Sequence, residues 1–179
     1  MCIRDRFWAQ VVVLTTAHGV DIEELVGFSR STDVERHLAQ NKLNIKHRVE
    51  ALIAAARQQL ALYKSGSMNA QQHAEWETRA VGTGSYRHST WESCPACEYE
   101  RGLLQGEQVN EVSEDWSSDS EDAPSMSGIV LSDEFSCDRC HLVLPSPELL
   151  AEAGVQESFE AELDPEDYFE FIGPEYGND

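Results

Sequence analysis

Cys94-Pro-Ala-Cys97 and Cys137-Asp-Arg-Cys140 are two matched Cys-x-x-Cys motifs, separated by 39 residues. A two-residue spacer lets both sulfurs of one tight turn point at a single ion, and two such turns supply the four thiolates of a closed tetrahedral zinc site. Apolar residues alternate on both sides of the second motif, at Phe135 and at Leu142–Leu144, as they do in short strands. The sequence therefore predicts a structural Zn²⁺ ion with the following ligands: Cys94, Cys97, Cys137 and Cys140.

This pattern resembles a zinc ribbon, in which two cysteine turns, or knuckles, cap a small antiparallel sheet. The resemblance covers residues 92–145. A module of this size buries too little apolar surface to be stable alone, so the resemblance implies that metal binding and folding are coupled.

Three alternatives use the same cysteines. Cys137, Cys140 and His141 also match the Cys-x-x-Cys-His pattern of haem attachment. A rubredoxin-like iron site would use the same four thiolates as zinc. Disulfides are the third alternative, although Cys-x-x-Cys pairs in a chain without a clear export signal favour metal binding. His141 is also the one candidate substitute ligand, but we expect it to begin the strand after the second knuckle.

The charge of the chain is very uneven. Residues 1–91 contain 11 Lys/Arg and 9 Asp/Glu, a net charge of +2, whereas residues 92–179 contain 2 and 24, a net charge of −22, so the second half accounts for the formal net charge of −20 of the whole chain. Long-range repulsion between an acidic ribbon and a phosphate backbone opposes binding of the ribbon to nucleic acid.

The first residues indicate a truncated, non-secreted chain. Met1–Arg6 resembles read-through of a sequencing adapter, so we expect the natural chain to begin earlier. The apolar stretch Phe7–Ala17 is too short to span a membrane as a helix, and no clear cleavage site follows it. We therefore expect a buried helix in a cytoplasmic protein that makes no membrane contact.

Residues 7–81 are predicted to be a helical region. Beyond the first stretch we expect a short helix from Asp21 to Gly27, a long helix from Ser31 or Thr32 to Lys64, and a third, capped by Asn69, that ends near Val81. The long helix has one apolar stripe: Val34, Leu38, Ile45, Val49, Leu52, Ala56, Leu60 and Tyr63. Helices joined by short connections predict a helical hairpin.

The remaining segments complete an α+β fold: the helical hairpin, a small antiparallel zinc ribbon and a short C-terminal helix. A Gly/Ser/Thr-rich linker is predicted at 82–91. Within the ribbon, the acidic stretch 110–127 is predicted to be a disordered insertion. Residues 146–179 are predicted to form a helix at Pro147–Ala153, followed by an acidic-aromatic tail from Glu157.

Two nucleic-acid functions are alternatives for the long helix. Arg36, Lys42, Lys46 and Arg48 could form a basic face that contacts nucleic acid, although acidic residues lie among them. Lys42 and His47 weakly resemble the Arg and His of the HEPN ribonucleases. Both the Lys and the Leu that follows it depart from that motif, and Lys lacks the planar fork of Arg.

Motifs for catalysis are missing from the sequence. It has no Gly-rich phosphate loop, no Gly-x-Ser-x-Gly and no His-Glu-x-x-His. A catalytic zinc also needs an open position, which four cysteines close. The arrangement is similar to bacterial proteins of unassigned function that have a helical N-terminal part and a C-terminal zinc ribbon. We therefore expect a non-catalytic, zinc-containing module that binds a protein partner.

Overall fold

The computed structural model describes residues 11, 28–79, 81, 86–115 and 125–164. These residues form three helices and seven strands, all paired antiparallel, which agrees with the expected mixture of helix and sheet. The predicted helices at Phe7–Ala17 and Asp21–Gly27 lie almost entirely outside the described residues. The chain divides into two compact units between Arg48 and Val49.

Helix α3 (Phe28–Lys64) is the long helix, and it begins three residues before the predicted Ser31. Its predicted apolar stripe contains the least exposed residues of the helix: Val34, Val49, Ala56 and Leu60. The helix ends at Lys64. Gly66 follows with φ +65°, a conformation that favours glycine, and the Ser67 amide donates to the Leu62 carbonyl at 3.1 Å.

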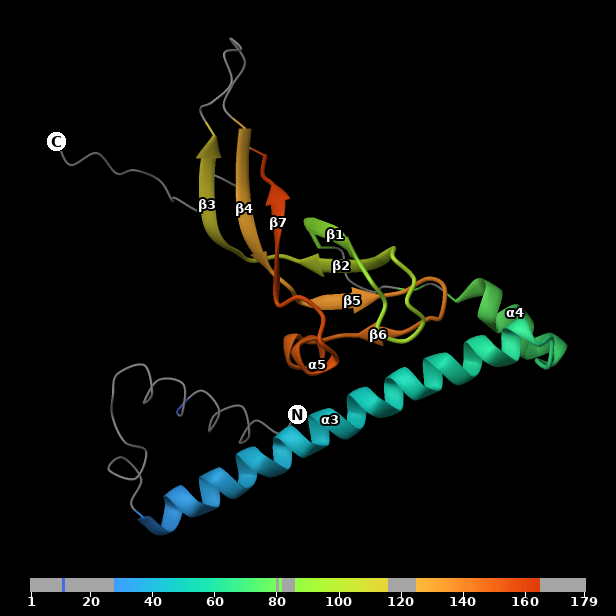
Figure 1. Cartoon of the computed structure of the whole chain (residues 1–179), viewed down its shortest axis with the longest axis horizontal. Helices are drawn as coiled ribbons and strands as arrows, with labels where there is room; N and C mark the ends of the chain where they lie inside the picture. The colour runs from blue at the N-terminus through green and yellow to red at the C-terminus, as the bar shows by residue number, and fades with distance from the viewer. Residues whose placement is uncertain (1–10, 12–27, 80, 82–85, 116–124, 165–179) are drawn as a thin grey trace. The chain divides into compact units, whose positions relative to one another are not determined.

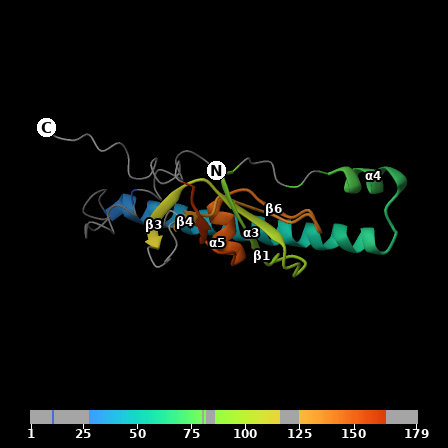
Figure 2. The same ribbon diagram turned by 90° about the horizontal axis from the view of Figure 1, so that it is seen from above.

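Helix α4 (Ala70–Thr78) folds back beside the end of α3 (Figures 1 and 2). The predicted cap is confirmed, because Asn69 and Gln72 exchange hydrogen bonds of 2.9 and 3.0 Å between side chain and backbone. Trp76 of α4 is buried and stacks on Tyr63 of α3 with ring centroids 5.4 Å apart. The helix ends at Thr78, short of the predicted Val81.

Two long antiparallel arms form the centre of the β part (Figure 1). One arm contains β2 and β3, the other β4 and β5, with these bounds: Gly102–Gly106, Val109–Asp115, Ser125–Leu131 and Glu134–Ser136. Strand β2 pairs with β5, and β3 with β4. Between the two pairs, the Leu131 amide donates to the Gln108 carbonyl at 2.9 Å, which keeps the arms joined.

Three further strands and one helix extend these arms. Strands β1 (His88–Glu92) and β6 (Val143–Leu144) complete a four-stranded sheet of order β1-β2-β5-β6. Strand β7 (Ser158–Glu162) pairs with β4 and completes a three-stranded sheet of order β3-β4-β7. Helix α5 (Pro147–Ala153) matches its predicted bounds and ends at Gly154, where φ is +72°.

The core of the four-stranded sheet lies on one face of it. Leu104, Phe135 and Leu144 are directly opposite one another on β2, β5 and β6, and none of the three is exposed to solvent. Helix α5 lies against β5 and contributes the buried residues Leu149 and Leu150. These long-range apolar contacts hold the strand ends from which both knuckles project.

The predicted linker at 82–91 is wrong for residues 88–91, which belong to β1. Its Ser and Thr residues suggested a loop, but Thr90 lies opposite the buried Leu104 and Trp91 lies opposite Leu103. Because β-branched and aromatic side chains pack well on a half-buried sheet, this pairing outweighs the local composition.

The predicted disorder of the acidic insertion 110–127 is also wrong where the structure describes it. Residues 110–115 and 125–127 lie in β3 and β4, and residues 158–162 form β7. Val109, Val130 and Phe159 form one cross-strand apolar row, which buries Val130 and Phe159. Glu111, Glu160 and Glu162 lie on the other face, with Ile129 and Ser127 of β4. Residues 116–124 and 165–179 lie outside the described part of the chain.

Candidate metal centre

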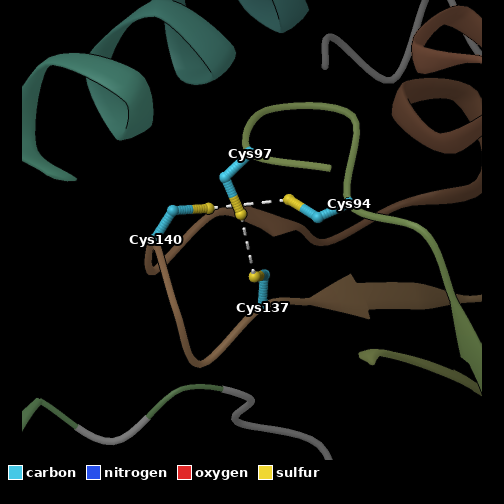
Figure 3. A group of neighbouring side chains, drawn as sticks. All are labelled: Cys94, Cys97, Cys137 and Cys140. Carbon is cyan, nitrogen blue, oxygen red and sulfur yellow. Dashed lines mark hydrogen bonds between the residues drawn. The ribbon is translucent and has the colours of Figure 1, made fainter. Parts of the chain in front are cut away.

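Both knuckles lie at the same end of the four-stranded sheet. The first connects β1 to β2, and the second connects β5 to β6. Strands β2 and β5 are hydrogen-bonded neighbours, with Leu103 opposite Ser136, so their pairing brings the two knuckles together. Figure 3 shows all four cysteine sulfurs directed toward one another from these two turns.

The four sulfurs form one cluster of the size that a metal ion requires. Sγ of Cys94 lies 3.5 Å from Sγ of Cys140, and Sγ of Cys97 lies 3.8 Å from Sγ of Cys137. All four sulfurs lie within 4.8 Å of one another. A tetrahedron with metal–sulfur bonds of about 2.3 Å has sulfur–sulfur edges of about 3.8 Å. The cluster therefore fits a tetrahedral thiolate site, as the sequence predicted.

The two knuckles repeat one backbone arrangement. In the first, the Cys94 amide donates to the Tyr99 carbonyl and the Glu98 amide donates to the Cys94 carbonyl, both at 2.9 Å. The second knuckle has the same two bonds, at 2.9 and 2.8 Å, with His141 in place of Glu98. These bonds close each turn so that its two sulfurs face the same point.

His141 does not begin a strand, which corrects the prediction. It lies in the left-handed region, with φ +57°, as does Glu98 with φ +58°. This conformation costs about 1–2 kcal/mol in a residue other than glycine, and the closed hydrogen bonds of each knuckle offset the cost. His141 also lies outside the sulfur cluster, and its ring instead packs against Trp76 with centroids 4.0 Å apart.

The cluster is shielded from solvent and favours a negative charge even without metal. Cys94, Cys137 and Cys140 are buried, and Cys97 is half-buried. Hydrogen bonds from Cys137 and Cys140 lower the pKa of Cys94 to about 4, whereas the same side-chain hydrogen bonding raises the pKa of Cys140. Thiolates are the form that binds metal, so this arrangement prepares the cluster for a cation.

The distances and pairing of the four sulfurs argue against disulfides and haem attachment, two of the alternatives for these cysteines. All four are free, and the sulfur distances far exceed the roughly 2.05 Å of a disulfide bond. Haem attachment would use Cys137 and Cys140 alone, yet each is paired with a sulfur of the other knuckle. A rubredoxin-like iron centre would have the same geometry as a zinc centre, so metal content must distinguish them.

The residues considered for nucleic-acid binding are exposed along α3. Lys42 and Lys46 lie one turn apart on the same side, while Arg36 forms an ion pair of 2.9 Å with Asp33. Lys42 and His47 are five residues apart, which separates them by about 140° around the helix axis. One copy of α3 therefore does not bring this pair together as an acid–base site.

Two side chains that contact the knuckles of the four-cysteine cluster lack a sequence signal. Arg57 of α3 donates from Nε to the Ala96 carbonyl at 2.8 Å and from Nη2 to the Pro95 carbonyl at 3.0 Å. Trp76 of α4 contacts His141 in the second knuckle. In the sequence Arg57 resembles any other cation on a solvated helix face, because its partners are 38 and 39 residues away.

No protein-family model, curated protein or solved structure matches this chain significantly. Within the described residues, none of the helices combines the length and the apolar character needed to cross a membrane. The four-cysteine cluster and the surfaces around it are therefore the features of this chain that indicate a function.

Proposed function

We propose that this chain is a non-catalytic interaction module in which Cys94, Cys97, Cys137 and Cys140 hold one structural Zn²⁺ ion. The observation that carries the proposal is the convergence of four largely buried sulfurs on one point. Four thiolates complete a tetrahedral shell and leave no position for a substrate, which supports a structural role. The ion would join two turns that are far apart in the sequence and would stabilise the sheet ends that carry them.

A protein is the partner that the surface of the second unit favours. A cleft of about 690 Å³ lies between α3 and α4, and its lining includes Leu62, Met68 and Trp76. Leu62 is 40% exposed there, so the cleft offers apolar surface to a partner. The three-stranded sheet places Glu111 and Glu160 on the same face, on either side of Ile129 of β4, and such acidic surface repels nucleic acid.

Metal analysis tests the site. Protein purified without added metal should contain one zinc per chain and show no visible absorption. Replacement by Co²⁺ should give the d–d and sulfur-to-cobalt bands of a tetrahedral four-thiolate site. Iron with charge-transfer bands, a Soret band, or no bound metal would each overturn the zinc proposal.

A matched pair of variants tests the partner surface. Leu62→Glu should remove the proteins that the wild-type chain retains from a cell extract, because it places a charge in the cleft. Leu43→Glu is the control, since Leu43 is similarly exposed, at 49%, but does not line the cleft. Retention of the same proteins by Leu62→Glu and the wild type would exclude the cleft as the binding surface.

A further inference from the structure

The side chain of Arg57 contacts the backbone of the first knuckle. Its guanidinium donates to two consecutive carbonyls, those of Pro95 and Ala96, at 3.0 and 2.8 Å. Both carbonyls lie in the spacer between Cys94 and Cys97. Two hydrogen bonds from one rigid guanidinium hold the peptide planes more firmly than a single flexible ammonium would.

The same two peptide groups contain the amides of Ala96 and Cys97, which follow Cys94 in the turn. The carbonyl of Pro95 shares a peptide unit with the amide of Ala96, and the carbonyl of Ala96 shares one with the amide of Cys97. After the side-chain hydrogen bonds of Cys137 and Cys140, hydrogen bonding from these two amides also lowers the pKa of Cys94. Each peptide unit therefore accepts from Arg57 at its oxygen and donates to the sulfur at its nitrogen. Hydrogen bonds linked in this way polarise and strengthen one another.

A metal centre of four thiolates would benefit from this arrangement. One Zn²⁺ with four thiolates has a net charge of −2, in a half of the chain where acidic residues greatly outnumber basic ones. The guanidinium of Arg57 places a positive charge next to these two peptide groups and polarises them, which increases the positive character of their amides near Cys94. Groups that orient and polarise the ligands in this way commonly change metal affinity by about 10- to 100-fold.

We propose that Arg57 is a positioning residue of the metal centre, which holds the first knuckle in its metal-binding conformation and strengthens the bond to Cys94. This inference rests on the proposed function, because it requires that the four cysteines bind metal. It also assigns a role to the helical hairpin, in which α3 contacts the first knuckle through Arg57 and α4 contacts the second through the Trp76–His141 ring pair.

Zinc affinity tests the proposal directly. Competition with a chromophoric chelator should show binding that is about 10- to 100-fold weaker for Arg57→Met than for the wild type. Arg57→Lys should recover part of the loss, because an ammonium keeps the charge but not the paired donors. The control is Lys64→Met, which removes one exposed positive charge from the same helix and should bind zinc within about twofold of the wild type.

The Co²⁺ spectrum separates the two ways in which this could fail. If the wild type lacks the bands of a four-thiolate site, the proposed function itself is wrong. If those bands are present and Arg57→Met binds zinc as tightly as the wild type, only the role of Arg57 is overturned. An equal loss of zinc affinity in Arg57→Met and Lys64→Met would also overturn the role of Arg57, because the loss would then come from the change in net charge alone.

The coupling between the Arg57 contact and zinc binding must also act in the reverse direction. If the Arg57 contact tightens zinc binding by a given factor, zinc must strengthen that contact by the same factor. Removal of zinc from the wild type should therefore increase amide hydrogen exchange in the Val49–Lys64 part of α3. In Arg57→Met this zinc-dependent protection should be smaller by the same 10- to 100-fold. Identical protection with and without zinc in the wild type would contradict the coupling.

Discussion

Replacement of Cys97 by serine isolates the contribution of one thiolate, because Cys97 is the least buried member of the cluster. The substitution is nearly isosteric and creates almost no cavity, so its effect on the metal-free protein should be small. Structural zinc contributes about 10–16 kcal/mol at pH 7 in small zinc modules. If the four ligands contribute equally, one thiolate accounts for about 3 kcal/mol, which is a loss of roughly 100-fold in zinc affinity.

This loss can be converted into a thermal shift. At a free zinc concentration above both dissociation constants, a 100-fold difference in Kd lowers the stability of the zinc form by about 2.7 kcal/mol. For a ribbon of this size, each kcal/mol corresponds to about 4–8 °C. Cys97→Ser should therefore unfold roughly 10–20 °C below the wild type in zinc-buffered solution, as followed by circular dichroism.

Two comparisons make this prediction refutable. Cys2→Ser makes the same chemical change outside both Cys-x-x-Cys motifs and should leave the Tm unchanged. In the presence of a strong chelator, Cys97→Ser and the wild type should unfold at nearly the same temperature. Equal Tm values for Cys97→Ser and the wild type in zinc buffer would refute a four-thiolate structural site.

Three further predictions concern the sheet and the free thiols. Phe135→Ala should lower the free energy of unfolding by about 3–5 kcal/mol in urea titrations, because this ring is fully buried. Gly106→Ala should lower the free energy of unfolding by at least about 3 kcal/mol, because a Cβ there would overlap a backbone carbonyl of β4. Gly66→Ala should lower it by only about 1–2 kcal/mol, because the space around Gly66 is open. In the zinc-free protein, the pKa of Cys94 is lowered from 9.0 to about 4, so its thiolate stabilises the fold at high pH and this contribution is lost as the pH falls. Urea titrations of that form should show stability rising from about pH 5 to about pH 8, and a flat profile would contradict the role of this thiol.

The elements predicted correctly are those with local signals. The α3 stripe has helical spacing, and the cap of α4 needs only Asn69 and Gln72, three residues apart. Helix α5 has a proline at its first position and Gly154 just after its last. In each of these elements, neighbouring residues supply the hydrogen bonds and conformations that define it, so composition and spacing were sufficient.

The strands in the acidic segments had no such signal. Strands β3 and β7 contain many Glu, Asp and Ser residues, and their stability comes from partners elsewhere. The row of Val109, Val130 and Phe159 joins three strands that are distant in the sequence. Apolar residues that are sparse along the chain become a continuous surface only when register aligns them. A criterion based on composition therefore predicted disorder for residues 110–115 and 125–127, which strand pairing places in β3 and β4.

The sequence by itself identified the four candidate metal ligands, because a two-residue spacer defines each knuckle locally and the remaining cysteine lies outside both pairs. The tertiary structure alone decided how that centre is surrounded. The contacts of Arg57 with Pro95 and Ala96 join residues 38 and 39 positions apart, and Trp76 reaches His141 from another helix. Such contacts depend on how helices and sheet pack, and packing depends on the whole set of long-range contacts rather than on any short stretch of the chain.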